Sequence, residues 1–129
     1  MDIRFHILIT PVAKERARFT KLGHAYTPSK TKEYENAIRD ALQSGQYTDK
    51  LIDYPIAVSM IFELPRPKKP KFDVPAVRPD VDNYAKAVLD AFNGVLYTDD
   101  ALVCDLTCIK RYSETPGIWV RISSLDIPC

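Results

Sequence analysis

The sequence predicts an α+β fold in which helices pack on a mixed sheet within a single domain covering residues 1–129. The chain is long enough for one buried core and too short for two ordinary domains. Apolar residues make up 46% and charged residues 27%, which excludes disordered, collagen-like and coiled-coil chains. Strand-like and helix-like patterns follow one another in the order β-α-β-α-β-β, which is typical of this fold class.

The first half of the chain supplies two strands and one helix. Residues 3–9 alternate and end at a Thr-Pro pair, which predicts a strand. Residues 12–29 are basic and irregular. A helix is expected from Ser29, which can cap it as Thr31 can. Residues 43–54 are polar and loop-like, and 55–64 predict a second strand. Apolar side chains recur at helical spacing in the first helix: Tyr34, Ile38, Ala41 and Leu42.

A sharp change of composition follows at residues 65–79. This stretch holds five prolines and five basic residues. Proline fixes φ and removes a backbone donor, so the stretch cannot be a central strand. We expect an extended or mobile Pro/Lys-rich loop within the domain rather than a linker between domains.

A second helix is expected after Pro79. Its apolar residues lie on one side of a helical wheel, and Asn93-Gly94 gives the left-handed stop that ends many helices. Those apolar residues are Val81, Tyr84, Ala85, Val88, Leu89, Ala91 and Phe92.

The last two strands follow. Residues 101–112 alternate, which predicts a half-buried strand, and residues 118–122 predict the final strand after a turn. The apolar face expected for the first of these strands is Leu102, Cys104, Leu106 and Cys108.

Net charge and cysteine content narrow the class of protein. The formal net charge is +1, so overall charge alone does not indicate a nucleic-acid partner. The three cysteines include no C-x-x-C pair, which argues against a disulfide framework or a zinc site and favours a reducing cytoplasm. No apolar run is long enough to span a membrane, and the N-terminus lacks the pattern of a signal peptide.

Acidic residues gather at two corners of the expected fold. Asp80 and Asp82 flank the start of the second helix, and Asp99-Asp100 precede the following strand. If Asp80, Asp82 and Asp100 converge, their repulsion calls for a cation, and carboxylate oxygens suit Mg²⁺. The alternative is structural, because an Asp at a helix start is commonly a cap and an Asp-Asp pair commonly a turn.

Lys86 lies four residues after Asp82 on the polar face of the second helix. It could form an ordinary i,i+4 ion pair. It could instead be a cation beside the metal site, binding the scissile phosphate or steadying the attacking water. Asp90, one turn further, is interpreted as holding Lys86 in place rather than binding metal.

Residues 78–101 resemble the signature of RusA-type Holliday junction resolvases, with D-x-D-N-x-x-K followed by an aromatic residue and D-D-A. The run Pro11–Thr20 with Tyr26-Thr27-Pro28 is similar to the P-x-x-K-x-R-x-R-F segment of phage and prophage members. The resemblance covers about half of the chain. It places the family's catalytic aspartates on Asp80, Asp82 and Asp100, and its catalytic-site lysine on Lys86.

The resemblance implies a RusA-like, Mg²⁺-dependent endodeoxyribonuclease, with Mn²⁺ as the alternative metal and no organic cofactor. It implies a homodimer, not membrane-bound, that resolves four-way DNA junctions by paired symmetric nicks in recombination and repair. The place of action would be the cytoplasm of a bacterial host, with the gene belonging to the host, a phage or a prophage.

Two basic segments are expected to contact DNA phosphates beside the acidic site. The residues proposed for this role are Lys14, Arg16, Arg18, Lys30, Lys32, Lys68, Lys69, Lys71 and Arg78.

Three other functions remain open at this point. The same chemistry could act on flaps, forks or other branched DNA. The chain could be a non-catalytic DNA-binding module whose acids are caps and turns. A structural Ca²⁺-binding domain is disfavoured, because the chain lacks a D-x-D-x-D-G loop.

Overall fold

The computed structural model describes residues 1–14, 18–19, 23, 25–26, 29–45, 47 and 49–125. Its centre is a four-stranded sheet in the order β1-β6-β4-β5. The β4–β5 pair is parallel, whereas β6 runs antiparallel to both β1 and β4, so the sheet is mixed as expected. The strands are β1 (Asp2–Ile7), β4 (Ile56–Leu64), β5 (Val103–Tyr112) and β6 (Gly117–Ser124).

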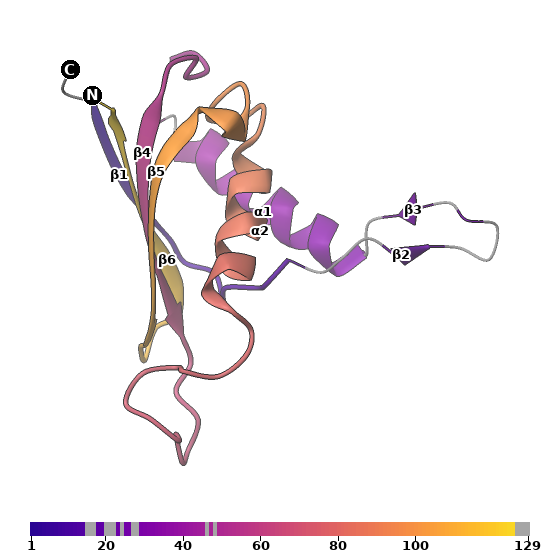
Figure 1. Ribbon diagram of the computed structural model, residues 1–129, viewed down its shortest axis with the longest axis vertical. Coiled ribbons are helices and arrows are strands. Elements are labelled where there is room, and N and C mark those ends of the chain that lie inside the picture. The colour runs from indigo at the N-terminus through magenta and orange to yellow at the C-terminus, as the bar shows by residue number, and fades with distance from the viewer. Residues whose placement is uncertain are drawn as a thin grey trace.

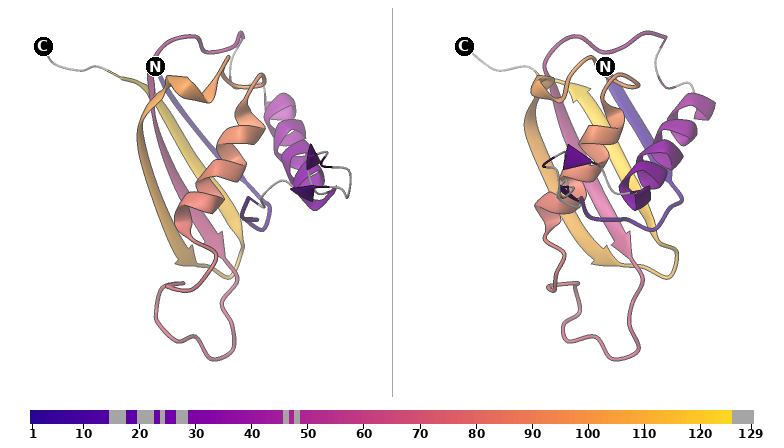
Figure 2. Two further views of the ribbon diagram at one scale, coloured as in Figure 1. Left: turned by 45° about the vertical axis from the view of Figure 1, so that its right-hand side comes forward. Right: turned by 90° about the vertical axis from the view of Figure 1, so that its right-hand side faces the viewer.

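Two helices cover one face of this sheet and leave the other face open (Figures 1 and 2). They are α1 (Ser29–Gly45) and α2 (Val81–Phe92). The α+β class and the order β-α-β-α-β-β are therefore confirmed, with a short antiparallel pair added between β1 and α1. That pair is β2 (Arg18–Phe19) and β3 (Ala25–Tyr26), which Figure 1 shows away from the sheet.

The core lies between the helices and the covered face of the sheet. Alternate residues of β4 and β6 point into it, and the buried stripe of each helix packs against them. Tyr97 is fully buried beneath the end of α2 and donates a hydrogen bond from its hydroxyl to the Leu89 carbonyl at 2.7 Å. Burial, reinforced by nearby aspartates, raises the pKa of this hydroxyl. It therefore acts as a neutral donor that fixes the chain after α2.

Two expectations need correction. The first helix runs on to Gly45, so it includes the first residues of the stretch expected to be a loop from residue 43. Strand β5 forms, but it begins at Val103, because Ala101 and Leu102 belong to a short 3₁₀ helix rather than to the strand expected from residue 101. Its supposed buried face is largely open: Cys104 is exposed and Leu106 is 45% exposed. Leu106 is open because β5 lies at the edge of the sheet and pairs with β4 alone among the described strands. Cys104 has no partner on β4, because the register shifts between Ile56 and Ala57 and interrupts the expected alternation.

Residues 65–79 contain no helix or strand, as their prolines predict. They hang below the end of the sheet between β4 and α2 (Figure 1). Gly94 has a φ of +75°, which matches the left-handed stop expected after α2. Among the described residues, no helix is both long enough and apolar enough to cross a membrane.

Candidate active site

The start of α2 presents two carboxylates. Asp80 occupies the N-cap position with extended backbone (φ −70°, ψ 150°), and its carbonyl accepts the N–H groups of Asn83 and Tyr84 at 3.1 and 3.4 Å. Its side chain forms no capping hydrogen bond within the described residues. Asp82 lies in the first turn, where the helix dipole favours negative charge. Both side chains are exposed, so capping does not account for the Asp80 carboxylate.

The second acidic pair divides into one structural and one available residue. Asp99 caps the short 3₁₀ helix η1 (Asp100–Leu102), because its Oδ1 accepts the N–H of Ala101 at 3.2 Å. Asp100 follows it directly and is half-buried. The interpretation of this pair as a turn therefore holds for Asp99, while Asp100 remains available as a ligand.

A cavity of about 460 Å³ lies between α2 and the edge strand β5. It brings together Asp82, Lys86 and Asp100, three of the four residues expected at the site. The fourth residue, Asp80, is not among the described residues that line the cavity. The full lining is Val81, Asp82, Ala85, Lys86, Leu89, Asp90, Asp100, Leu106 and Cys108. Leu106 and Cys108, on the helix-facing side of β5, thus form one wall of the cavity.

The donors in this cavity are suited to a hard cation. Asp82 and Asp100 offer only carboxylate oxygens, which Mg²⁺ and Mn²⁺ accept. Within the parts of the chain that the structure describes, no three His, Cys, Asp or Glu side chains gather closely enough to hold a metal ion. Mg²⁺ commonly binds through one or two carboxylates and completes its shell with water and substrate phosphate. Two carboxylates beside an open cavity fit that mode.

Cys108 also lines the cavity, but its thiol is poorly suited to reaction. Burial raises the pKa of this thiol to about 11, which keeps it protonated at neutral pH. The residue therefore contributes a neutral, largely apolar part of the wall rather than a ready nucleophile.

The cations of the site meet at Asp90. Its Oδ2 lies 3.1 Å from Nζ of Lys14 and 3.6 Å from Nζ of Lys86. Lys14 also contacts Oε1 of Glu35, on α1, at 2.8 Å. Among the described residues, Lys86 pairs with Asp90 rather than Asp82, which agrees with the interpretation that Asp90 holds Lys86.

Lys14 is held at this point by its backbone as well. Its N–H donates to the Asn83 carbonyl at 2.9 Å, which attaches the chain after β1 to the first turn of α2. Burial disfavours the charged amine, but the contacts with Glu35 and Asp90 outweigh this cost and raise the pKa of Lys14. The sequence pattern suggested a phosphate contact for Lys14. It gave no sign of Glu35, which lies 21 residues away.

The other residues expected to contact DNA lie at the surface where they are described. Lys30 and Lys32 are exposed in the first turn of α1. Arg16 and the side chain of Arg18 lie outside the described residues. The members from the Pro/Lys-rich loop are all exposed: Lys68, Lys69, Lys71 and Arg78. Beside them Phe72 is 49% exposed, with Nζ of Lys71 at 5.7 Å from its ring centre.

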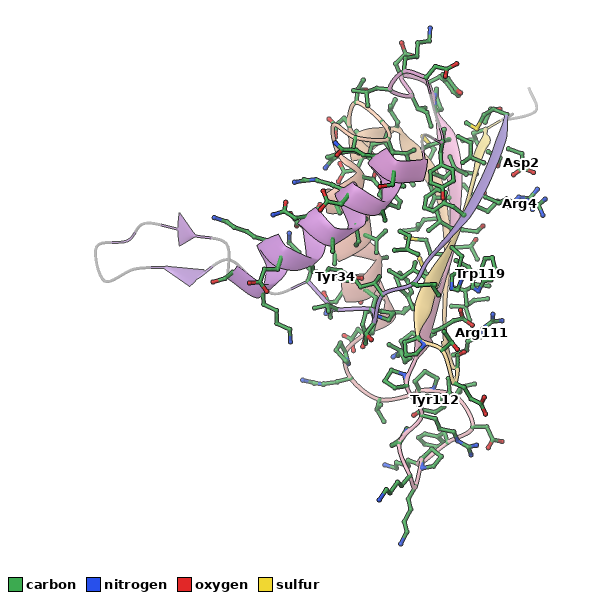
Figure 3. All side chains as sticks on the ribbon, turned by 180° about the vertical axis from the view of Figure 1, so that it is seen from behind. Asp2, Arg4, Tyr34, Arg111, Tyr112 and Trp119 are labelled. Atoms are coloured by element: carbon green, nitrogen blue, oxygen red, sulfur yellow. The ribbon has the colours of Figure 1, made fainter. Side chains whose placement is uncertain are left out.

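The open face of the sheet carries a second notable surface. Figure 3 shows Trp119, Arg4 and Asp2 on the side away from the helices. Trp119 is 44% exposed and stacks on His6 with ring centres 4.0 Å apart. At one end Asp2 pairs with Arg4 and Arg121 at 3.1 and 3.2 Å, and hydrogen bonds from both lower its pKa. This face is therefore an apolar centre flanked by charges of both signs.

Comparison with known proteins gives two matches. The family model described as endodeoxyribonuclease RusA matches residues 9–123. The uncharacterized protein YqaN of Bacillus subtilis (strain 168) is 34% identical over 140 aligned positions, covering 96% of this chain and 97% of YqaN. The family match spans both acidic pairs, Lys86, β4, β5 and the two helices.

Proposed function

Because this chain belongs to the RusA family of endodeoxyribonucleases, we propose that it resolves Holliday junctions by paired, symmetric, Mg²⁺-dependent nicks. The observation that carries the proposal is the cavity between α2 and β5, where Asp82, Asp100 and Lys86 share one lining. A binding module whose acids were only caps would not need this arrangement. Asp99 alone of the second pair is used as a cap.

Asp82 and Asp100 would hold the metal. Asp80, which lies at the N-cap outside the cavity lining, is the third proposed ligand and would have to turn its exposed carboxylate toward them when the metal binds. A Mg²⁺ ion bound there would polarise the phosphodiester and favour attack by water. Attack by water at phosphorus breaks the P–O3′ bond and leaves a 3′-hydroxyl and a 5′-phosphate. Lys86 would offset the negative charge that grows on the phosphate oxygens, and Asp90 would restrain its ammonium at the cavity wall.

The Pro/Lys-rich loop and the first turn of α1 would hold the DNA against this acidic site. Exposed lysines and arginines neutralise phosphates without reading sequence. Phe72 has the exposure needed to stack on a base that is unpaired at the branch point. In this proposal the cavity cleaves the phosphodiester, and the loop supplies affinity for DNA through Lys68, Lys69, Lys71 and Arg78.

Two symmetric nicks require two equivalent sites, which a twofold homodimer would supply. The surface that best supports such a dimer is the open face around Trp119. Its apolar centre and its charges of both signs are features of self-complementary surfaces. Sedimentation of wild type and Trp119→Ala tests this: loss of a dimer in the variant is expected, and a wild-type monomer at all concentrations would exclude it.

The decisive experiment is cleavage of a synthetic four-way junction with Mg²⁺. Wild type is expected to give paired symmetric nicks, whereas Asp82→Asn and Asp100→Asn should bind the junction without cutting it. Asp99→Asn is the matched control, since asparagine can also cap η1 and the neighbouring Asp100 is retained. Three-way junctions, flaps and linear duplexes serve as competing substrates.

The outcomes separate the alternatives. Faster cutting of flaps or forks than of four-way junctions would assign the same chemistry to other branched DNA. Tight junction binding that is indifferent to Mg²⁺ and to Asp82→Asn, without cutting, would exclude the catalytic function and favour a DNA-binding module.

A further inference from the structure

Lys110 lies on β5 outside the cavity, and the sequence pattern gives it no role. It pairs in register with Phe62 of β4, which is fully buried, so its side chain lies on the face of the sheet that the helices cover. The residue as a whole is half-buried, while its ammonium lies at the exposed end of the side chain. The stem of the side chain can therefore pack along the sheet while the ammonium reaches hydrogen-bond acceptors at the surface.

The acceptors are two carbonyl groups just upstream of α2. Nζ of Lys110 lies 2.9 Å from the carbonyl oxygens of both Val77 and Pro79. These residues flank Arg78, and Pro79 directly precedes Asp80. One ammonium thus holds the backbone on either side of a proposed phosphate contact and immediately before a proposed metal ligand.

The segment held by these two hydrogen bonds has no regular structure of its own. Residues 77–80 form no helix or strand, and their side chains are exposed. The start of the same loop is also attached to the end of β5, because the N–H of Ser113 donates to the Leu64 carbonyl at 2.9 Å. The residue before the Pro/Lys-rich loop is therefore bonded to the residue that follows β5, and the end of the loop is bonded to Lys110 within β5.

We infer that Lys110 is a positioning residue: it donates to the Val77 and Pro79 carbonyls and so fixes the backbone from which the Arg78 and Asp80 side chains extend at the start of α2. The inference rests on the proposed function, because it takes Asp80 as a metal ligand. Charge-assisted hydrogen bonds are stronger than neutral ones, so two of them can fix a segment without regular structure. Arginine could keep donors to both carbonyls, whereas methionine could not.

The test compares Lys110→Met and Lys110→Arg with wild type, using Lys50→Met as the control because Lys50 is exposed and has no role in the site. Titration calorimetry with Mn²⁺ on the DNA-free protein measures metal affinity without any reliance on cleavage. We expect Lys110→Met to weaken Mn²⁺ binding and raise the half-saturating Mg²⁺ concentration by about tenfold. Lys110→Arg should restore most of both.

A double-mutant cycle separates positioning from general stability. If Lys110 acts through Asp80, Lys110→Met should have little further effect on Mn²⁺ affinity once Asp80→Asn is present. Unchanged metal affinity in Lys110→Met, or full additivity with Asp80→Asn, would overturn the inference. If Lys110→Met fails to fold, full Mn²⁺ affinity in Lys110→Gln, whose shorter amide cannot span both carbonyls, would overturn it equally. Failure of wild type to cut any branched DNA would overturn the proposed function instead. The Mn²⁺ affinities from calorimetry would still show whether Lys110 positions the metal site.

Discussion

Lys14 and Lys86 contact the same oxygen of Asp90 but occupy opposite environments. The Lys14 side chain is 20% exposed and lies between two carboxylates, at 2.8 and 3.1 Å. The Lys86 side chain is 63% exposed and lies 3.6 Å from Asp90 alone among the described acids. Lys14 joins the chain after β1 to both helices, whereas Lys86 faces the cavity. A lysine therefore stabilises the fold at position 14, whereas the lysine at position 86 remains available to bind substrate.

Asp90 can support both tasks at once. Asp90 is half-buried, so it would be costly without a partner, and Lys14 satisfies that need from the interior side. Lys86 can then leave its weaker contact for a phosphate without leaving Asp90 unpaired. The comparison predicts separate losses of activity and of stability.

The largest effect is expected from Lys86→Met. Single-turnover cleavage at saturating Mg²⁺ should fall by about 10²–10³-fold, because a cation aimed at the developing charge is removed. The free energy of unfolding should change by less than about 0.5 kcal/mol, since an exposed i,i+4 pair contributes little. Lys86→Arg should keep part of the rate. A normal cleavage rate in Lys86→Met would show that Lys86 is an ordinary surface residue.

A smaller effect, on stability, is expected from Lys14→Met. Glu35 and Asp90 would lose their shared partner while remaining largely buried, which should cost about 1–3 kcal/mol in urea unfolding. Cleavage per folded molecule should fall by less than about tenfold, in line with a residue that acts only through its neighbours. Normal stability with lost junction binding would restore the phosphate contact first assigned to Lys14.

The smallest effect is the pH dependence of that stabilisation. The pKa of Lys14 is raised above its ordinary value of 10.5 in the folded protein, so folding favours its charged form. The stability difference between wild type and Lys14→Met should therefore stay constant up to about pH 9. It should shrink only as the pH rises through the raised pKa. A difference that already disappears near pH 8 would contradict the ion-pair account.

Much of the fold followed from local patterns. Some features depend only on a few neighbouring residues and could be predicted from the sequence. They are the apolar stripe of α2, the end of that helix at Gly94 and the lack of regular structure in the proline-rich residues 65–79. The motif around Asp82 and Lys86 was equally local, and the family match agrees with it. The burial of β5 could not be read in this way, because Leu106 would be covered in a central strand and is open in an edge strand.

Periodicity and motif spacing act along the chain, so the residues alone indicated the class of fold, the endodeoxyribonuclease family and the acidic residues for which a metal-binding role is proposed. Only the folded structure shows which residues of the same type have different roles. It separated Asp99 from Asp100 by one capping hydrogen bond and Lys14 from Lys86 by burial. It also brought Lys110 to the carbonyls before Asp80. The Asp99 cap and the Lys86–Asp90 pair are local, but sequence alone does not choose between two neighbouring aspartates that could both cap. The contacts of Lys14 and Lys110 join distant segments and exist only once the helices lie on the sheet.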